Sequence, residues 1–173
     1  MTNNDILRRL RYAFDFNNVR VAKVMAHIKA GVEPPQVGRW IQPDDFDPLS
    51  DAGLCQFLDG LIIEKRGPRP DGSTPEPMES ISNNEILKKL RIALSLREEG
   101  MMAVFKEADF VVTKAELGSF FRKKGQRNYA DCPEQVLRKF IHGLGQVTGQ
   151  ETGQENSYSR PMSQLFILLV IAP

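Results

Sequence analysis

The stretch TNNDILRRLR at residues 2–11 is repeated as SNNEILKKLR at residues 82–91, an offset of 80 positions. Every difference between the two stretches is conservative. The same offset holds downstream, and after a three-residue difference in loop length it becomes 83, as for Leu54 with Leu137, Phe57 with Phe140 and Gly60 with Gly143. A register kept over most of both copies predicts an internal duplication.

Both copies open on the signature of a helix N-terminus. Thr2 with Asp5, and Ser82 with Glu85, have the spacing of a capping box, in which the hydroxyl accepts from the third amide and the acid reaches back. Apolar residues then recur at helical spacing, namely Ile6, Leu7, Leu10 and Ala13, and Ile86, Leu87, Leu90 and Ala93. Each copy therefore begins with an amphipathic helix.

Three further helices are expected in each copy. The second spans about 18–29 and 98–108, the third begins at 34–35 and at 113, and the fourth begins near 50 and 133 and ends near Gly60 and Gly143. The third helix of copy two is expected to continue through 121–129. No stretch shows strand alternation, so the predicted fold is all-α, a tandem repeat of two small four-helix modules. The short turn before the third helix is compatible with a helix-turn-helix.

The domain organisation follows from the repeat. Module one covers 1–66, a linker with four prolines and two glycines covers 67–81, module two covers 82–148, and a polar then apolar tail covers 149–173. The apolar run at 165–172 is too short to cross a membrane, and a short buried or sticky segment is expected there. Because a module this small buries a limited fraction of its surface, we expect the copies to pack on each other or on a partner chain.

Composition excludes several classes of protein. The chain has 173 residues, 41% hydrophobic and 26% charged, with a net charge of +1, so it is not a polycation. Its two cysteines, Cys55 and Cys132, share no ligand spacing and favour free thiols over a disulfide or zinc site. The first residues show no basic segment followed by an apolar stretch, so we expect no secretory signal and a cytoplasmic protein without a cofactor.

The candidate binding residues are Arg122, Lys123, Lys124, Arg127 and Tyr129, four cations and an aromatic side chain that can contact a nucleic-acid backbone. Residues 82–149 hold twelve Lys and Arg against eight Asp and Glu, a net charge of +4, whereas residues 1–66 hold nine of each. Solvation of the surface and of a helix C-terminus explains the same cations without a partner. The sequence thus predicts a non-catalytic binding protein, with nucleic acid as the leading partner and a protein adaptor as the alternative.

Other polar clusters carry weaker signals. Asp44, Asp45 and Asp47 begin like a calcium loop but lack its glycine and final glutamate, which favours a solvated loop. His27 and His142 lack ligands at metal-binding spacing. A basic edge recurs on the first helix of each copy, formed by Arg8, Arg9 and Arg11 and by Lys88, Lys89 and Arg91. Phosphate-binding loops and hydrolase motifs are missing from the sequence, so no enzyme activity is expected.

The paired openings, together with ADFVVTKAELGSFFRKKGQRNY at 108–129 and LRKFIHGL at 137–144, resemble the YehS-like family of bacterial proteins. The resemblance covers about residues 1–146 and implies a cytoplasmic bacterial protein with a duplicated domain of unknown function. It implies no catalytic residues. Two parts depart from the family pattern, namely the segment from Ile41 to Asp44 and the tail from about Gly149 onward. The first departure implies that the third helix of copy one ends early.

Overall fold

The computed structural model describes residues 1–42, 47–76 and 78–148. Over these residues the chain is all-helical. The helices are α1 (Asn3–Ala13), α2 (Asn18–Ala26), α3 (Pro34–Trp40), α4 (Asp51–Arg66), α5 (Asn83–Ala93), α6 (Glu98–Glu107), α7 (Lys114–Phe120) and α8 (Glu134–Val147). The predicted fold class is confirmed, with four equivalent helices in each copy. Within the part described, none of the helices is long and apolar enough to span a membrane.

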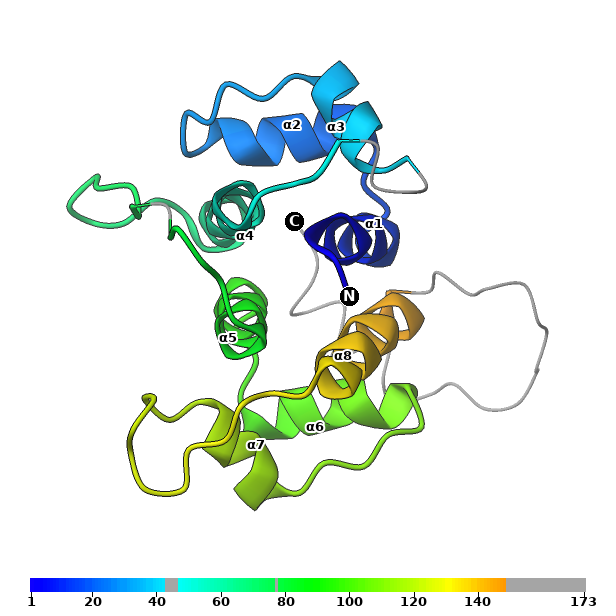
Figure 1. Ribbon diagram of the computed structural model, residues 1–173, viewed down its shortest axis with the longest axis vertical. Helices are drawn as coiled ribbons and strands as arrows, with labels where there is room; N and C mark the ends of the chain where they lie inside the picture. Colours follow the sequence, from blue (N-terminus) through cyan, green and yellow to red (C-terminus); the bar gives the residue numbers. More distant parts are fainter. Residues whose placement is uncertain (43–46, 77, 149–173) are drawn as a thin grey trace.

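The two copies form one body around a shared central layer. Figure 1 shows α1, α4, α5 and α8 side by side in the middle, with α2 and α3 on one side and α6 and α7 on the other. The copies meet along two helix pairs, α4 with α5 and α1 with α8. The expectation that the small modules pack against each other is therefore confirmed.

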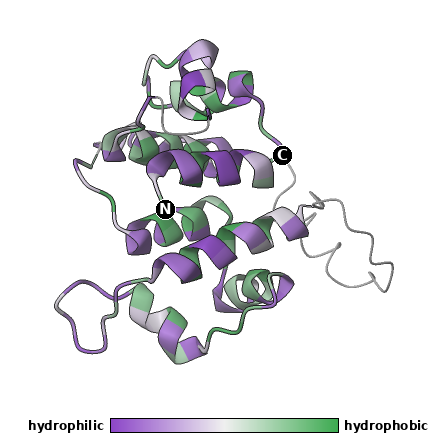
Figure 2. Ribbon diagram, turned by 45° about the vertical axis from the view of Figure 1, so that its right-hand side comes forward, coloured by the Kyte–Doolittle hydropathy of each residue, from purple (hydrophilic) through white to green (hydrophobic). Residues whose placement is uncertain are grey.

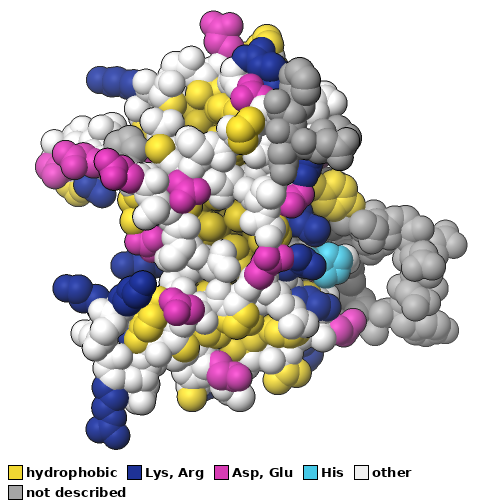
Figure 3. All heavy atoms as spheres, in the orientation of Figure 1, with side chains coloured by type: hydrophobic (Ala, Val, Ile, Leu, Met, Phe, Trp, Pro, Cys, Tyr) yellow, Lys and Arg dark blue, Asp and Glu magenta, His cyan; other side chains and the backbone are white. Residues whose placement is uncertain are grey.

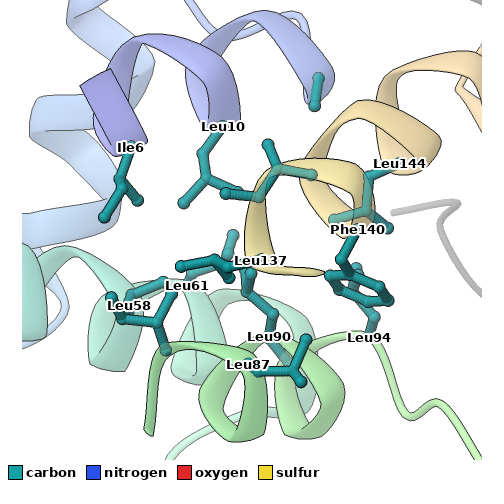
Figure 4. Packing of buried hydrophobic residues seen from close by; sticks show 14 of the residues in the cluster. Ile6, Leu10, Leu58, Leu61, Leu87, Leu90, Leu94, Leu137, Phe140 and Leu144 are labelled. Atoms are coloured by element: carbon teal, nitrogen blue, oxygen red, sulfur yellow. The ribbon is translucent and has the colours of Figure 1, made fainter. Parts of the chain in front are cut away.

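The core lies between the four central helices and draws on both copies. Figure 4 shows Leu10 of α1, Leu61 of α4, Leu90 of α5 and Phe140 of α8 converging on one apolar cluster, and all four are fully buried. Burying a side chain of this size contributes about 1.5–3 kcal/mol. In Figure 2 the central helices carry hydrophilic residues on one face and hydrophobic residues on the other, the pattern that the apolar spacing predicted.

The capping boxes form as the sequence predicted. Thr2 and Ser82 each accept from the backbone amide three residues on, and the carboxylates of Asp5 and Glu85 accept from the N-cap amides. A third box caps α7, where the Thr113 hydroxyl accepts from the Glu116 amide. These boxes satisfy amides that have no partner inside the helix.

The predicted ends of the fourth helices were wrong. α4 continues past Gly60 to Arg66, and α8 continues past Gly143 to Val147. A Cβ at Gly60 would lie 2.2 Å from the Val24 carbonyl oxygen, and one at Gly143 would lie 2.0 Å from that of Val104. These glycines permit close approach of α4 to α2 and of α8 to α6; they do not terminate a helix.

The third helices also differ from expectation. α3 ends at Trp40 and α7 at Phe120, which are equivalent positions, so copy one does not end earlier and copy two does not continue through 121–129. The segments before α3 and α7, 27–33 and 108–113, are longer than the three or four residues of a helix-turn-helix turn. The helix-turn-helix likeness stays a prediction. The tail at 149–173 lies outside the described residues.

Candidate nucleic-acid interface

The five candidate residues lie on the loop between α7 and α8, not on a helix. Arg122, Lys123, Lys124 and Arg127 are exposed, and Tyr129 is half-buried. The loop turns where Gly125 and Asn128 adopt positive φ angles of 88° and 62°. Both residue types tolerate this region of backbone space, which is why the chain reverses here instead of extending α7.

A buried asparagine anchors both ends of this loop. The Asn84 side-chain amide donates to the Phe120 carbonyl at 2.9 Å and to the Ala130 carbonyl at 2.8 Å, and its oxygen accepts from the Cys132 amide at 2.8 Å. At the start of the loop, the Arg91 guanidinium lies 4.6 Å from the centroid of the Phe121 ring, a cation–π contact. The cations are thus presented on a loop with a fixed base.

The acids beside this loop, Glu116 and Asp131, already have hydrogen-bond partners. Glu116 binds the Thr113 amide and hydroxyl, which lowers the pKa of its carboxyl, and Asp131 accepts from the Tyr129 hydroxyl at 2.6 Å. Among the described residues, the four loop cations form no ion pair. Figure 3 shows Lys and Arg side chains extending from this corner of the molecule, at the lower left.

Tyr129 is held in place by its hydrogen bond. The bond to Asp131 raises the pKa of the Tyr129 phenol. The Tyr129 ring can stack on a base. A phenol fixed at one end is a better stacking platform than a free one, because less rotamer entropy is lost on contact.

The equivalent loop of copy one is built differently. Its Asp47 carboxylate accepts from Gln36 at 2.7 Å and from Arg39 at 3.2 Å, so it closes onto α3. Asp44 and Asp45 lie outside the described residues. Across the described part of the chain, no group of three or more metal-binding side chains comes together.

The basic residues predicted to form an edge on the first helices contact several different partners. Arg8 pairs with Asp5, which lowers the pKa of that carboxyl, and Arg91 donates to the Leu96 carbonyl at 3.2 Å. Lys89 forms an ion pair with Asp59, which is only 3% exposed, at the α4–α5 contact. Lys88 and Arg9 are exposed. These residues therefore do not form one continuous basic surface.

Sequence reasoning missed two pairings between distant residues. Asp59 and Lys89 are 30 positions apart and belong to different copies. His27 contacts the Glu64 carboxylate at 2.5 Å, across 37 positions and two helices. For the first pair, helical periodicity gives one indication, because it places Asp59 on the same face of the helix as the buried Cys55. No local pattern marks the second.

Comparison with known proteins gives a family but no activity. The family model described as a protein of unknown function (DUF1456) matches twice, over residues 3–67 and 83–147. The chain belongs to the DUF1456 family. The chain is also 37% identical over 147 residues to an uncharacterized protein, YehS, of Escherichia coli (strain K12), an alignment that covers 83% of this chain and 94% of that protein.

The two matches coincide with the two structural copies, so the duplication read from the sequence is a duplication of the DUF1456 domain. The predicted resemblance to the YehS-like family is confirmed. No solved structure matches the chain.

Proposed function

We propose that this DUF1456 protein is a non-catalytic nucleic-acid-binding protein that contacts the phosphate backbone through the loop 121–129. The observation that carries the proposal is the set of four exposed cations, Arg122, Lys123, Lys124 and Arg127, which have no carboxylate partner in the described structure. Unpaired surface cations release counterions from nucleic acid when they bind it, and this term supplies most of non-specific affinity.

Two further features support the proposal. The loop is anchored by Asn84, so little conformational entropy is lost when its cations meet a ligand. The Tyr129 ring lies on the same loop and supplies a stacking surface, a combination typical of single-strand binding. Contacts to the phosphate backbone and stacking on bases do not recognise base edges, so we expect binding with little sequence preference.

The experiment is fluorescence anisotropy of labelled duplex DNA and of single-stranded RNA across salt concentrations. We expect the double variant Arg122→Ala with Lys123→Ala to bind roughly tenfold more weakly and to lower the slope of log affinity against log salt by about 2. The control, Lys23→Ala with Arg97→Ala, removes the same charge from exposed positions on other elements and should bind as wild type.

Either of two outcomes would overturn the proposal. If wild type fails to bind either nucleic acid at a salt concentration of about 20 mM, or if the control and the loop variant weaken binding equally, the loop is not a nucleic-acid interface.

One observation favours the alternative, a protein-protein interaction adaptor. A pocket of about 570 Å³ lies beside α6, lined by Met102, Phe110 and Val111, and Val111 is 90% exposed. The equivalents of Phe110 and Val111 in copy one are Ala30 and Gly31, so the apolar surface belongs to copy two alone. An adaptor would lose partner capture on Val111→Asp and keep it in the loop variant.

A further inference from the structure

The two contacts between the copies obey one internal pseudo-twofold relation. At the α4–α5 contact the Asp51 carboxylate accepts from the Ile81 amide at 3.1 Å, and at the α1–α8 contact the Glu134 carboxylate accepts from the Met1 amino group at 2.5 Å. Met1 and Ile81 differ by 80 positions, and Asp51 and Glu134 by 83, which are the offsets of the repeat. Equivalent residues therefore occupy equivalent places in both contacts.

The contacts differ at one charged position. In the α4–α5 contact, the buried Asp59 pairs with Lys89. Their equivalents in the α1–α8 contact are His142 and Arg9, by the same offsets of 83 and 80. A carboxylate has been replaced by an imidazole, which is neutral or cationic and never anionic. At the α1–α8 contact the cation is present as Arg9, but the position equivalent to Asp59 provides no carboxylate to pair with it.

The acids on α1 and α8, Asp5 and Glu134, already have partners. Asp5 pairs with Arg8, and Glu134 pairs with both the Met1 amino group and Arg138. Within the described residues, Arg9 and His142 form no ion pair, and both are exposed, whereas the Asp59 side chain is 4% exposed and that of Lys89 is 15% exposed. The α1–α8 contact thus leaves uncompensated positive charge at its surface.

A pocket lies at this place. It has a volume of about 310 Å³ and lies between α1 and α8, where Arg9, Tyr12, Ile141, His142 and Gly145 line it. Gly145 is the equivalent of Ile62 of α4, a half-buried side chain that packs against the core. Loss of that side chain opens space between the helices. In Figure 3, Lys and Arg side chains gather beside a histidine on this side of the molecule.

We infer that the α1–α8 pocket binds the carboxylate of a small organic molecule, which takes the place that Asp59 fills at the α4–α5 contact. Arg9 and His142 contact the carboxylate, because a guanidinium matches it in a bidentate geometry. The apolar part of the ligand lies against Tyr12 and Ile141 in the space left by Gly145. This site is separate from the loop 121–129 and does not depend on nucleic-acid binding.

The test uses ligand-observed NMR of benzoate with the full-length protein, with benzamide as its neutral counterpart and inorganic phosphate as an anion without an apolar part. A fragment of this size is expected to bind with a dissociation constant on the order of 1 mM. His142→Asp restores the internal acid and Gly145→Ile restores the missing side chain. Each should weaken benzoate binding at least about tenfold while the melting temperature stays equal or rises.

Two controls accompany these variants. Lys23→Gln makes the charge more negative by one unit on α2, away from the pocket, as His142→Asp does at the pocket, and should leave benzoate binding unchanged. Should His142→Asp fail to fold, Arg9→Gln tests the same charge at an exposed position and should also weaken benzoate binding.

The inference is overturned if benzoate fails to bind at about 10 mM, or if its affinity is unchanged in both His142→Asp and Gly145→Ile. Equal binding of benzamide would show that the charge is not recognised. Phosphate binding as tight as that of benzoate would overturn the assignment to carboxylates.

Discussion

At the residue scale, the paired asparagines that open each copy hold the module together. In copy one, Asn4 donates to the Trp40 and Asp47 carbonyls at 2.8 and 2.9 Å and accepts from the Leu49 amide at 2.9 Å. Asn84 makes the equivalent three bonds in copy two. Each asparagine side chain supplies hydrogen-bond partners to backbone groups of the loop after the third helix, which the loop itself does not provide.

Replacing Asn84 by alanine should therefore destabilise the protein by about 3 kcal/mol, because it leaves buried carbonyls and an amide without partners. Asn83→Ala is the matched control, since Asn83 makes one bond, to the Cys132 carbonyl at 3.0 Å, and its loss should cost about 1 kcal/mol. Urea denaturation followed by circular dichroism measures both. Equal losses in the two variants would contradict the anchoring role of Asn84.

Burial raises the pKa of the Cys132 thiol from 9.0 to about 12, and the residue is only 4% exposed. Above about pH 9 the unfolded thiol ionises while the folded thiol does not, so the contribution of Cys132 to stability is present below pH 9 and is lost as pH rises toward 12. We expect the free energy of unfolding to fall less steeply between pH 9 and 10.5 in Cys132→Ala than in wild type. Identical slopes from urea melts at each pH would contradict this.

At the element scale, two glycines set how closely the helices of each module pack. Gly60 faces the Val24 carbonyl and Gly143 faces the Val104 carbonyl, and no Cβ fits at either place. A glycine inside a helix is unfavourable by itself, so its presence at both equivalent positions reflects the close approach of α4 to α2 and of α8 to α6.

Gly143→Ala should destabilise the protein by about 1–3 kcal/mol, because the clash with the Val104 backbone outweighs the gain in helix propensity. Gly145→Ala lies two residues away on the same helix, where the nearest atom to a Cβ is 3.9 Å distant, and should stabilise by up to about 1 kcal/mol. Thermal melts of the pair separate packing from propensity. A stabilising Gly143→Ala would show that the helices separate without cost.

At the scale of the whole molecule, the two copies share one core and should unfold together. The central layer takes α1 and α4 from copy one and α5 and α8 from copy two, and its buried side chains form a single cluster. Neither copy alone covers the apolar faces that meet across the α4–α5 and α1–α8 contacts. The modules are repeats in sequence but a single cooperative unit in structure.

Two probes test this cooperativity. The single tryptophan, Trp40, reports on copy one by fluorescence, and in a Cys55→Ala background the buried Cys132 reports on copy two by thiol labelling. We expect coincident midpoints in urea, and Leu61→Ala in copy one should shift both midpoints together, with a loss of about 2–5 kcal/mol. Separate transitions for the two probes would show that the copies fold independently.

The sequence by itself determined the duplication, the helical class and the caps, because these depend on residues within a few positions of each other. Capping boxes such as that of Thr2 and Asp5, and the apolar spacing of the first helices, are local patterns with local consequences. The exposure of the cations from Arg122 to Arg127 also followed from the sequence, but their position on a loop did not, since α7 ends where the Asn84 side chain binds Phe120.

Only the tertiary structure decided how the copies pair and what that pairing creates. In the sequence the glycines at 60 and 143 indicate helix ends, whereas in the structure they lie against the carbonyls of Val24 in α2 and Val104 in α6. The pair of Asp59 with Lys89, and the open equivalent at His142 and Arg9, depend on helices from different copies lying side by side. Such contacts join residues 30 to more than 130 positions apart, and no short-range pattern specifies which apolar face packs on which.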